Sequence, residues 1–158
     1  MTIICDTREH KEELYRILYQ FDRIGVSHEI HKLDVGDYMI KGKPNVVIDR
    51  KKDLGELCSN VTQQHERFRR ELIRAKAASI RFVILCEHGG SIHTIEDVKS
   101  WHNPRSKISP KAVRGEQLYH SLCTIRDRYG VDICFCDKRN TGRKIVEILE
   151  DSQRGSIT

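Results

Sequence analysis

The sequence predicts a single α/β domain built on a mixed β-sheet flanked by helices. The runs at 80–86 and 131–136 are almost wholly apolar, as expected for strands covered on both faces. Amphipathic segments with helical spacing alternate with strand-like runs along the chain. A length of 158 residues fits one domain whose core is large enough to fold without disulfides. We expect the domain to occupy residues 1–150 and a polar tail to follow at 151–158.

The first half of the chain is expected to contain two helices and four strands. The expected elements are a strand at 2–5, a helix at 10–24, a strand at 26–33, strands at 37–40 and 46–51, and a helix at 54–78. Leu14, Ile17 and Phe21 form one apolar stripe of the first helix. Phe68 and Leu72 lie on the corresponding stripe of the second. These stripes are expected to pack against the sheet.

The second half continues the alternation of strands and helices. The expected elements are a strand at 80–86, a short helix at 95–101, a Pro/Ser/Lys-rich loop, a helix at 115–129, a strand at 131–136 and a last helix beginning at 142–149. Leu118, Leu122 and Ile125 are spaced for one helix face. We therefore expect these helices to cover the sheet.

The charge distribution favours an anionic partner. The net charge is +5 and the sequence pI is about 8.9. Residues 67–81 carry six cations and one acid, and residues 99–114 carry five cations and no acid. The chain therefore has two local basic zones, which is typical of a protein that binds nucleic acid phosphates.

Cysteine usage and hydropathy place the chain inside the cell. None of the six cysteines forms a Cys-x-x-Cys pair, and most lie in strand-like apolar runs, so we expect reduced, structural thiols. No apolar run approaches the roughly 20 residues that a membrane helix requires. The strand-like start at residue 2 leaves no room for a signal peptide. An intracellular, DNA-associated protein with no membrane partner is expected.

The hairpin strands carry the residues that point most clearly to chemistry. The Gly/Pro/Asn-rich segment 41–45 indicates a tight turn, so folding the hairpin brings Asp37 close to Asp49. Asp49 and Lys51 are two residues apart on one strand and therefore share a face. Two carboxylates and an ammonium group are suited to hold Mg²⁺ or Mn²⁺ and to activate water on a phosphodiester.

Two further acidic residues are candidates for the same metal cluster. Asp6 ends the first strand as Asp49 ends its own buried run, and a carboxylate there is costly unless it is paired or metal-bound. Glu56 begins the helix that follows the Lys51 strand, so it is placed to reach the cluster. The alternative for Asp6 is an N-cap of the helix that starts after it.

Polar residues beyond the cluster are candidates for binding DNA. Gln63, Arg67 and Arg70 recur on one stripe of the helix expected at 54–78, and Arg74 extends that track or faces solvent. The basic loop after Trp101 adds the substrate-binding candidates Arg105 and Lys107. Trp101 itself either stacks on an unpaired base or anchors the loop to the core.

The motifs resemble those of the XPF structure-specific endonucleases. The segments concerned are Cys5-Asp6-Thr7-Arg8-Glu9, Gly36-Asp37-Tyr38, Asp49-Arg50-Lys51 and, more loosely, 56–59 and 68–72. The order of elements also matches the core of restriction-endonuclease-like nucleases. Specific motifs cover residues 2–90, whereas the rest of the chain resembles the family only in its strand–helix alternation.

The resemblance implies a restriction-endonuclease-like fold and a Mg²⁺- or Mn²⁺-dependent endonuclease that cuts branched DNA near duplex-to-single-strand junctions. It also implies a homodimer, with a recombination or replication protein as a further partner. The roles that it implies are Asp37, Asp49 and Asp6 in or beside the metal site, Lys51 assisting water and phosphate, and Arg8, Glu9 and Arg50 ordering the cluster or binding phosphate. A compact domain of this kind is expected of a phage or bacterial version of the family.

The chain departs from the family pattern at two positions. Asp49 stands where the family usually has Glu, and Gly55 stands where it has Asp, with Glu56 one residue late. The larger members' tandem helix-hairpin-helix module is absent from this sequence. Two alternative functions therefore remain open. One is a Holliday-junction resolvase acting as a symmetric dimer, and the other is a non-catalytic DNA-binding subunit.

Overall fold

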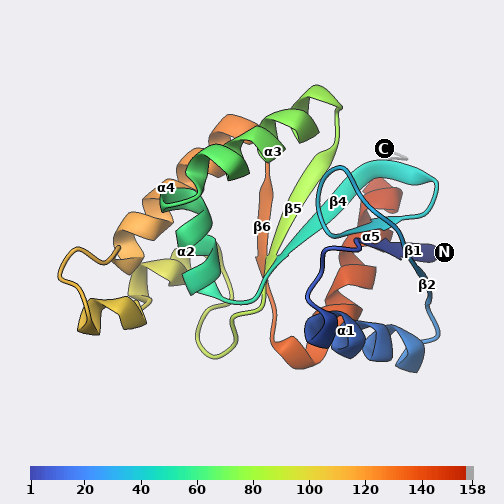
Figure 1. Cartoon of the computed structure of the whole chain (residues 1–158), viewed down its shortest axis with the longest axis horizontal. Helices are drawn as coiled ribbons and strands as arrows, with labels where there is room; N and C mark the ends of the chain where they lie inside the picture. The colour runs from blue at the N-terminus through green and yellow to red at the C-terminus, as the bar shows by residue number, and fades with distance from the viewer. Residues whose placement is uncertain (156–158) are drawn as a thin grey trace.

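A computed structural model describes residues 1–155 as one six-stranded mixed sheet with helices on both faces (Figure 1). The strands are β1 (Thr2–Cys5), β2 (Ser27–Ile30), β3 (Tyr38–Ile40), β4 (Lys43–Lys51), β5 (Arg81–Cys86) and β6 (Asp132–Phe135). The α-helices are α1 (Lys11–Arg23), α2 (Leu54–Thr62), α3 (His65–Ala77), α4 (Gly115–Tyr129) and α5 (Thr141–Gly155). Three 3-10 helices, η1 (Ile95–Ser100), η2 (Pro104–Lys107) and η3 (Lys138–Asn140), complete the described elements.

The strand order is β2-β1-β3-β4-β5-β6, and β3 is antiparallel to both of its neighbours. The pairs β1–β2, β4–β5 and β5–β6 are parallel. The predicted mixed sheet flanked by helices is therefore confirmed. Its central strands β4 and β5 are buried, which explains why residues 82–86 read as a continuous apolar run.

Each face of the sheet is covered by its own set of helices. The apolar stripes of α1 and α5 pack on one face, against side chains that include Ile48 and Val83. Helices α2, α3 and α4 cover the other face, where Val47 and Ile84 lie in their core. Because side chains alternate along β4, this strand contributes to both cores. The same alternation continues into the polar residues at its end.

The helix expected at 54–78 is two helices, because the chain breaks between α2 and α3. The Thr62 hydroxyl donates to the Cys58 carbonyl (2.7 Å), and the Gln64 N–H donates to the Ser59 carbonyl (3.0 Å). Local bonds of this kind compete with the regular helical ladder. The break allows α3 to change direction and lie along the sheet (Figure 1).

Other boundaries differ by a few residues from those that the sequence predicts. Strand β4 begins at Lys43, so the hairpin turn is shorter than expected, and β2 is shorter than the predicted strand at 26–33. Helix α5 continues to Gly155, past the expected boundary at 150, and residues 156–158 of the expected tail lie outside the described residues. Helix α1 has His10 at its N-cap position, so the alternative that Asp6 caps it is wrong.

The six cysteines are all free thiols, and three of them are buried. Within residues 1–155, every helix falls short of the length and apolarity that a bilayer-spanning segment needs.

Gly36 fixes the approach of the β3 strand to β4. Its φ of +74° lies in the left-handed region, and an added Cβ would lie 2.9 Å from the Val47 Cβ and 3.2 Å from the Ile48 carbonyl oxygen. Only glycine fits a contact this close with this backbone conformation. Asp37, the next residue, is held against β4 as a result.

Substitution of Gly36 by Ala is expected to lower the free energy of unfolding by about 3 kcal/mol, through backbone strain and steric overlap together. Gly42→Ala is the matched control, because Gly42 has φ +80° but nothing within 4 Å of its added Cβ. Its cost is expected to be only about 1 kcal/mol. Urea unfolding measures both, and equal costs would contradict the role given to the Val47 contact.

Candidate functional site

The structure brings Asp37 and Asp49 side by side at the end of β4. The Asp37 N–H donates to the Ile48 carbonyl (2.7 Å), and the Arg50 N–H donates to the Asp37 Oδ2 (2.7 Å). Burial raises the pKa of Asp37 well above its usual range, and the Asp49 and Glu9 carboxylates raise it further. Two buried acids in contact repel each other when both are ionised, so this pair favours a cation between them.

Lys51 supplies the nearest positive charge. Its Nζ lies 2.9 Å from the Asp49 Oδ2 and 5.0 Å from the centre of the Phe68 ring on α3. Burial alone would lower the pKa of Lys51, but the Asp49 carboxylate, with Asp37 and Glu56, outweighs burial and raises that pKa. Lys51 is therefore a fixed cation at neutral pH.

The Asp49 Oδ2 is buried and lacks a hydrogen-bond partner, although Lys51 is within ion-pair distance. An orphaned carboxylate oxygen beside a second carboxylate provides the hard oxygen ligands that Mg²⁺ and Mn²⁺ prefer. The residues present therefore fit a divalent cation held by Asp37 and Asp49.

The larger cluster that the sequence suggested is not assembled. Across residues 1–155, no group of three or more His, Cys, Asp or Glu side chains is arranged to hold a metal ion. Both Asp6 oxygens are occupied, one by the Leu33 N–H (2.8 Å) and the other by the Arg8 guanidinium (2.7 Å). Glu56 accepts from the Lys52 N–H (3.3 Å). Asp6 thus anchors the loop before β3, while Glu56 lies at the rim of the site.

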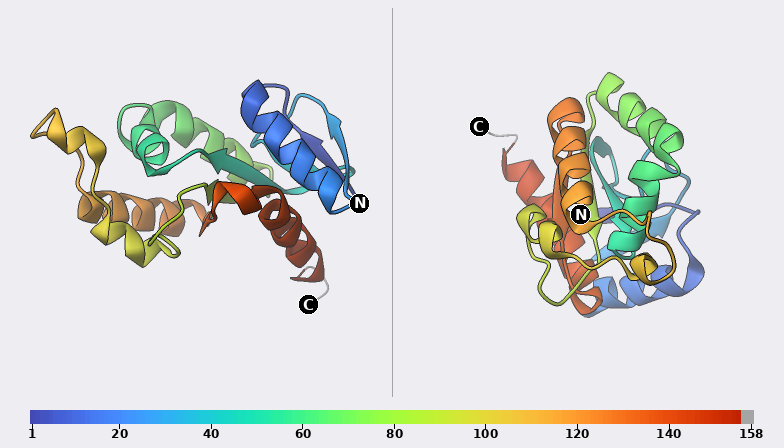
Figure 2. Two further views of the ribbon diagram at one scale, coloured as in Figure 1. Left: turned by 90° about the horizontal axis from the view of Figure 1, so that it is seen from below. Right: turned by 90° about the vertical axis from the view of Figure 1, so that its left-hand side faces the viewer.

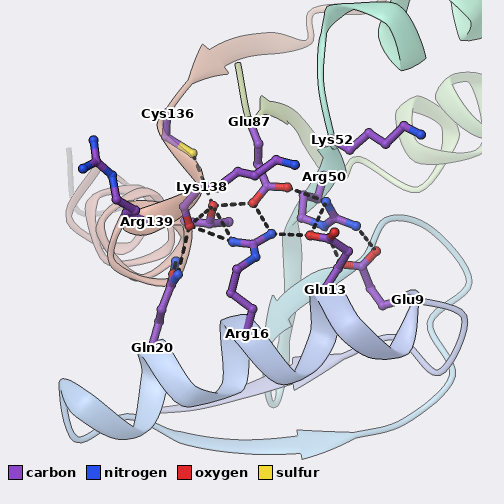
Figure 3. A network of polar contacts seen from close by, with 12 residues as sticks. Glu9, Glu13, Arg16, Gln20, Arg50, Lys52, Glu87, Cys136, Lys138 and Arg139 are labelled. Atoms are coloured by element: carbon purple, nitrogen blue, oxygen red, sulfur yellow. Dashed lines mark hydrogen bonds and ion pairs between the residues drawn. The ribbon is translucent and has the colours of Figure 1, made fainter. Parts of the chain in front are cut away.

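Arg50 lies on the opposite face of the sheet from Asp49 and Lys51. Its guanidinium donates to Glu9 (2.7 and 3.1 Å) and to Glu87 (2.5 Å), in the network drawn in Figure 3. These contacts fit the ordering role that the resemblance implied for Glu9 and Arg50, whereas a catalytic role for Arg50 and a substrate-binding role for Glu9 stay predictions. Both side chains are committed to each other, and Glu9 also accepts from the Tyr38 hydroxyl (2.6 Å). They position the strand that carries the pair.

Glu87 is the centre of this network. Its carboxylate, only 2% exposed as a residue, accepts from Arg50, from Arg16 on α1 (2.6 Å) and from the Thr141 hydroxyl at the start of α5. Figure 3 shows Arg16 from α1 and Arg50 from the sheet converging on Glu87. A buried charge shared in this way joins both covering helices to the end of β4. A fully bonded network is needed because an unpaired buried charge is costly.

A cleft of about 1020 Å³ opens over the Asp37–Asp49 pair, between the loops at the strand ends and helices α2 and α3. Its arginine and lysine lining residues are Arg8, Arg50, Lys51, Lys52, Arg67, Arg70, Arg74 and Arg105. Five of the predicted substrate-binding residues, Arg8, Glu9, Arg67, Arg70 and Arg105, therefore line the same cleft as the carboxylates. The predicted Gln63 and Lys107 are not among the lining residues. Gln63 instead ends α2, and its neighbour Gln64 faces the cleft.

Two acidic residues of the site were missed in the sequence. Glu71 on α3 lines the cleft, and burial raises its pKa, with the Asp49 carboxylate raising it further. The only feature of the sequence that pointed to Glu71 was its position as the one acid in an arginine-rich segment. Glu87 had a clearer signal, because it directly follows the apolar β5 strand, just as Asp49 follows buried residues of β4.

Comparison with known proteins decides the family. The family model of the ERCC4 domain matches residues 5–148. The chain belongs to the ERCC4 domain family. The structure is similar to that of XPF from Aeropyrum pernix, with a TM-score of 0.68, 19% identity and coverage of 98% of this chain and 66% of the other. A structure described as "XPF from Aeropyrum pernix, complex with DNA" gives a TM-score of 0.67, 16% identity and the same coverage.

The predicted resemblance to the XPF nuclease domain is thereby confirmed, and the fold is shared across nearly all of this chain. The chain spans 66% of the length of the XPF chains that it matches. No curated protein matches the sequence. The ERCC4 domain assignment reaches residue 148, well beyond the segment 2–90 whose motifs carried the resemblance.

Glu87→Gln is expected to lower the free energy of unfolding by about 3 kcal/mol, because the buried Arg50 guanidinium and the half-buried Arg16 guanidinium lose their shared counter-charge. Denaturant unfolding measures the change. Asp132→Asn is the matched control, since Asp132 forms an exposed ion pair with Arg81 (2.7 Å) and is expected to cost less than about 1 kcal/mol. Similar costs for the two substitutions would show that the network is not what holds the strand end.

Proposed function

We propose that this chain is a Mg²⁺- or Mn²⁺-dependent DNA endonuclease that hydrolyses phosphodiester bonds at flaps, forks or junctions. One observation carries the proposal: a buried carboxylate pair, Asp37 and Asp49, with Lys51 beside it, lies in a cleft with an arginine-rich wall. Carboxylates for a metal, a fixed cation and a phosphate-binding wall are what phosphodiester hydrolysis requires.

Asp37 and Asp49 are the residues that would hold the metal. When bound, a divalent cation polarises the phosphate and lowers the pKa of a coordinated water. The Arg50 backbone N–H orients Asp37, while the Arg50 side chain holds the strand from the other face through Glu9 and Glu87. Both ligands are therefore positioned before substrate binds, which avoids the cost of ordering them during the reaction.

Lys51 acts as an electrostatic stabiliser. Its charged ammonium group is placed to stabilise the negative charge that develops on the phosphate as water attacks. A charged ammonium has no free electron pair, so it does not accept the proton of the attacking water. Attack at phosphorus with loss of the 3′-oxygen leaves a 5′-phosphate and a 3′-hydroxyl, and we expect these product ends.

The cleft wall supports DNA as the substrate. Arg67, Arg70 and Arg74 recur on α3, exposed along the cleft. They are expected to bind successive phosphates, and each phosphate neutralised on duplex DNA adds about −0.9 to the salt slope of binding. The DNA complex of the structurally similar Aeropyrum pernix XPF supports the same substrate class. Selection of branched DNA, homodimer formation and a recombination or replication protein partner are parts of this proposal.

A second candidate function is that of a non-catalytic DNA-binding subunit. Gly55, in the first turn of α2, lies on the cleft lining where the family pattern has an aspartate. Its lack of a carboxylate leaves Asp37 and Asp49 as the acidic pair on which metal binding depends. Cleavage distinguishes the two functions.

The test is cleavage of end-labelled flap, fork and four-way-junction DNA in Mg²⁺ or Mn²⁺. The wild type is expected to cut near the branch, Asp49→Asn to be at least about 10³-fold slower, and Lys51→Ala about 10²-fold slower. Asp127→Asn, an exposed acid on α4, is the control and is expected to cut normally.

The outcomes separate the candidates. Symmetric paired nicks on four-way junctions would select the Holliday-junction resolvase. Binding of branched DNA without cleavage in either metal would reject the endonuclease function and favour the non-catalytic DNA-binding subunit.

A further inference from the structure

A basic arm, residues 104–114, projects from the domain beside the cleft. It consists of η2 and the turn that leads into α4, and Figure 2 (left) shows it extending beyond the helices in gold and orange. The arm contains Arg105, Lys107, Lys111 and Arg114 and no acidic residue. Arg105 also lines the cleft, so the arm continues the surface that holds the Asp37–Asp49 pair.

The cations of the arm are available to a ligand. Arg105, Lys107 and Lys111 are exposed, and within residues 1–155 their charged groups form no ion pair or side-chain hydrogen bond. A cluster of unpaired cations attracts a polyanion. Nucleic acid phosphates match this requirement and are already the ligand expected in the adjoining cleft.

Ile108 lies among these cations with 87% of its surface exposed. The other exposed large hydrophobic residues in the described chain are between 36% and 62% exposed. Trp101, the aromatic residue that the sequence offered for base stacking, packs against the core instead. The apolar group that the arm presents is therefore Ile108.

The arm is held in shape by hydrogen bonds at its base. Asn103 is buried, its side-chain oxygen accepts from the Arg105 N–H (3.0 Å), and its side-chain amide donates to the Val113 carbonyl (2.9 Å). Asn103 thus clamps the two ends of the arm together. The Ile108 N–H in turn donates to the Arg105 carbonyl (2.9 Å), which fixes the isoleucine on the last turn of η2. A backbone ordered before binding loses little entropy on binding.

We propose that Ile108 is a wedge that enters the base stack of DNA at the branch, while Arg105, Lys107 and Lys111 bind the flanking phosphates. Apolar wedges partly unstack a base step and stabilise bent or opened DNA. An isoleucine has no hydrogen-bonding group, so it selects an opened stack rather than a base identity. The inference rests on the proposed function and adds the residue that would give it preference for branched DNA.

A second copy of the chain is the competing occupant of the arm. All charged residues of the arm are cations and the chain carries a net charge of +5, so two copies repel each other where their arms approach. DNA offers both the opposite charge and an apolar interior in its base stack. The charge of the arm therefore favours DNA.

The test uses the Asp49→Asn protein, which is expected to bind without cutting, and a flap DNA with 2-aminopurine next to the branch. Binding is expected to raise the 2-aminopurine fluorescence, and Ile108→Ala in the same background is expected to abolish most of that rise. Ile108→Ala is also expected to weaken flap binding about tenfold while leaving plain duplex binding within about twofold. Ile30→Ala, at a 46% exposed residue on the edge strand β2, is the control and should change neither quantity.

Three results would overturn the inference. An unchanged fluorescence rise in Ile108→Ala, while the wild type still cuts branched DNA, would reject the wedge and leave the nuclease standing. A fall from dimer to monomer in Ile108→Ala, measured by light scattering, would assign Ile108 to self-association. No binding of flap DNA by the wild type would reject both the wedge and the proposed function.

Discussion

The close approach of residues 36 and 37 to β4 is the constraint on which the site depends. Gly36 has no side chain to separate the strands, so the Asp37 backbone bonds to Ile48 and its carboxylate reaches the Arg50 N–H. The same approach places Asp37 against Asp49. Two carboxylates are thus kept together by the backbone, although their mutual repulsion opposes it.

The alternation of side chains along β4 divides its polar end into two functions. Asp49 and Lys51 form an ion pair on one face, whereas the Arg50 side chain between them reaches Glu9 and Glu87 on the other. The Arg50 side is closed by Glu9 and Glu87, which hold the strand rigidly. The cleft side is left with an unsatisfied carboxylate oxygen on Asp49. One strand end therefore combines a satisfied structural network with an unsatisfied site that favours a cation.

The sequence predicted most of the fold, because its signals are local. The apolar runs of β5 and β6 and the stripes of α1 and α4 follow directly from periodicity. The break between α2 and α3 was missed, since it depends on the Thr62 hydroxyl and on packing rather than on a Gly or Pro. The pairing of Asp37 with Asp49 followed from hairpin geometry and holds in the structure.

The parts of the site that sequence reasoning did not find depend on long-range contacts. The Thr141 hydroxyl donates to Glu87, a residue 54 positions earlier in the chain, and nothing in the sequence around Thr141 predicts this contact. Asp6 looked like a metal ligand because it ends a strand, but one of its oxygens accepts from the distant Leu33 N–H and the other from the nearby Arg8 guanidinium. Strand alternation places the Arg50 side chain on the opposite face of β4 from Asp49 and Lys51. This placement follows from the sequence alone, whereas the catalytic role predicted for Arg50 came from the motif resemblance.

Thermal unfolding of the wild type and Asp37→Asn, each without metal and with Mn²⁺, tests the central claim that Asp37 and Asp49 form a cation site. Without metal, Asp37→Asn is expected to be the more stable by about 1 kcal/mol, because the amide removes the repulsion and can donate to the neighbouring Asp49 carboxylate. Mn²⁺ is expected to raise the unfolding midpoint of the wild type and to leave that of Asp37→Asn unchanged. Two results would contradict the cation site: a wild type that is the more stable of the two without metal, or equal shifts of both midpoints in Mn²⁺.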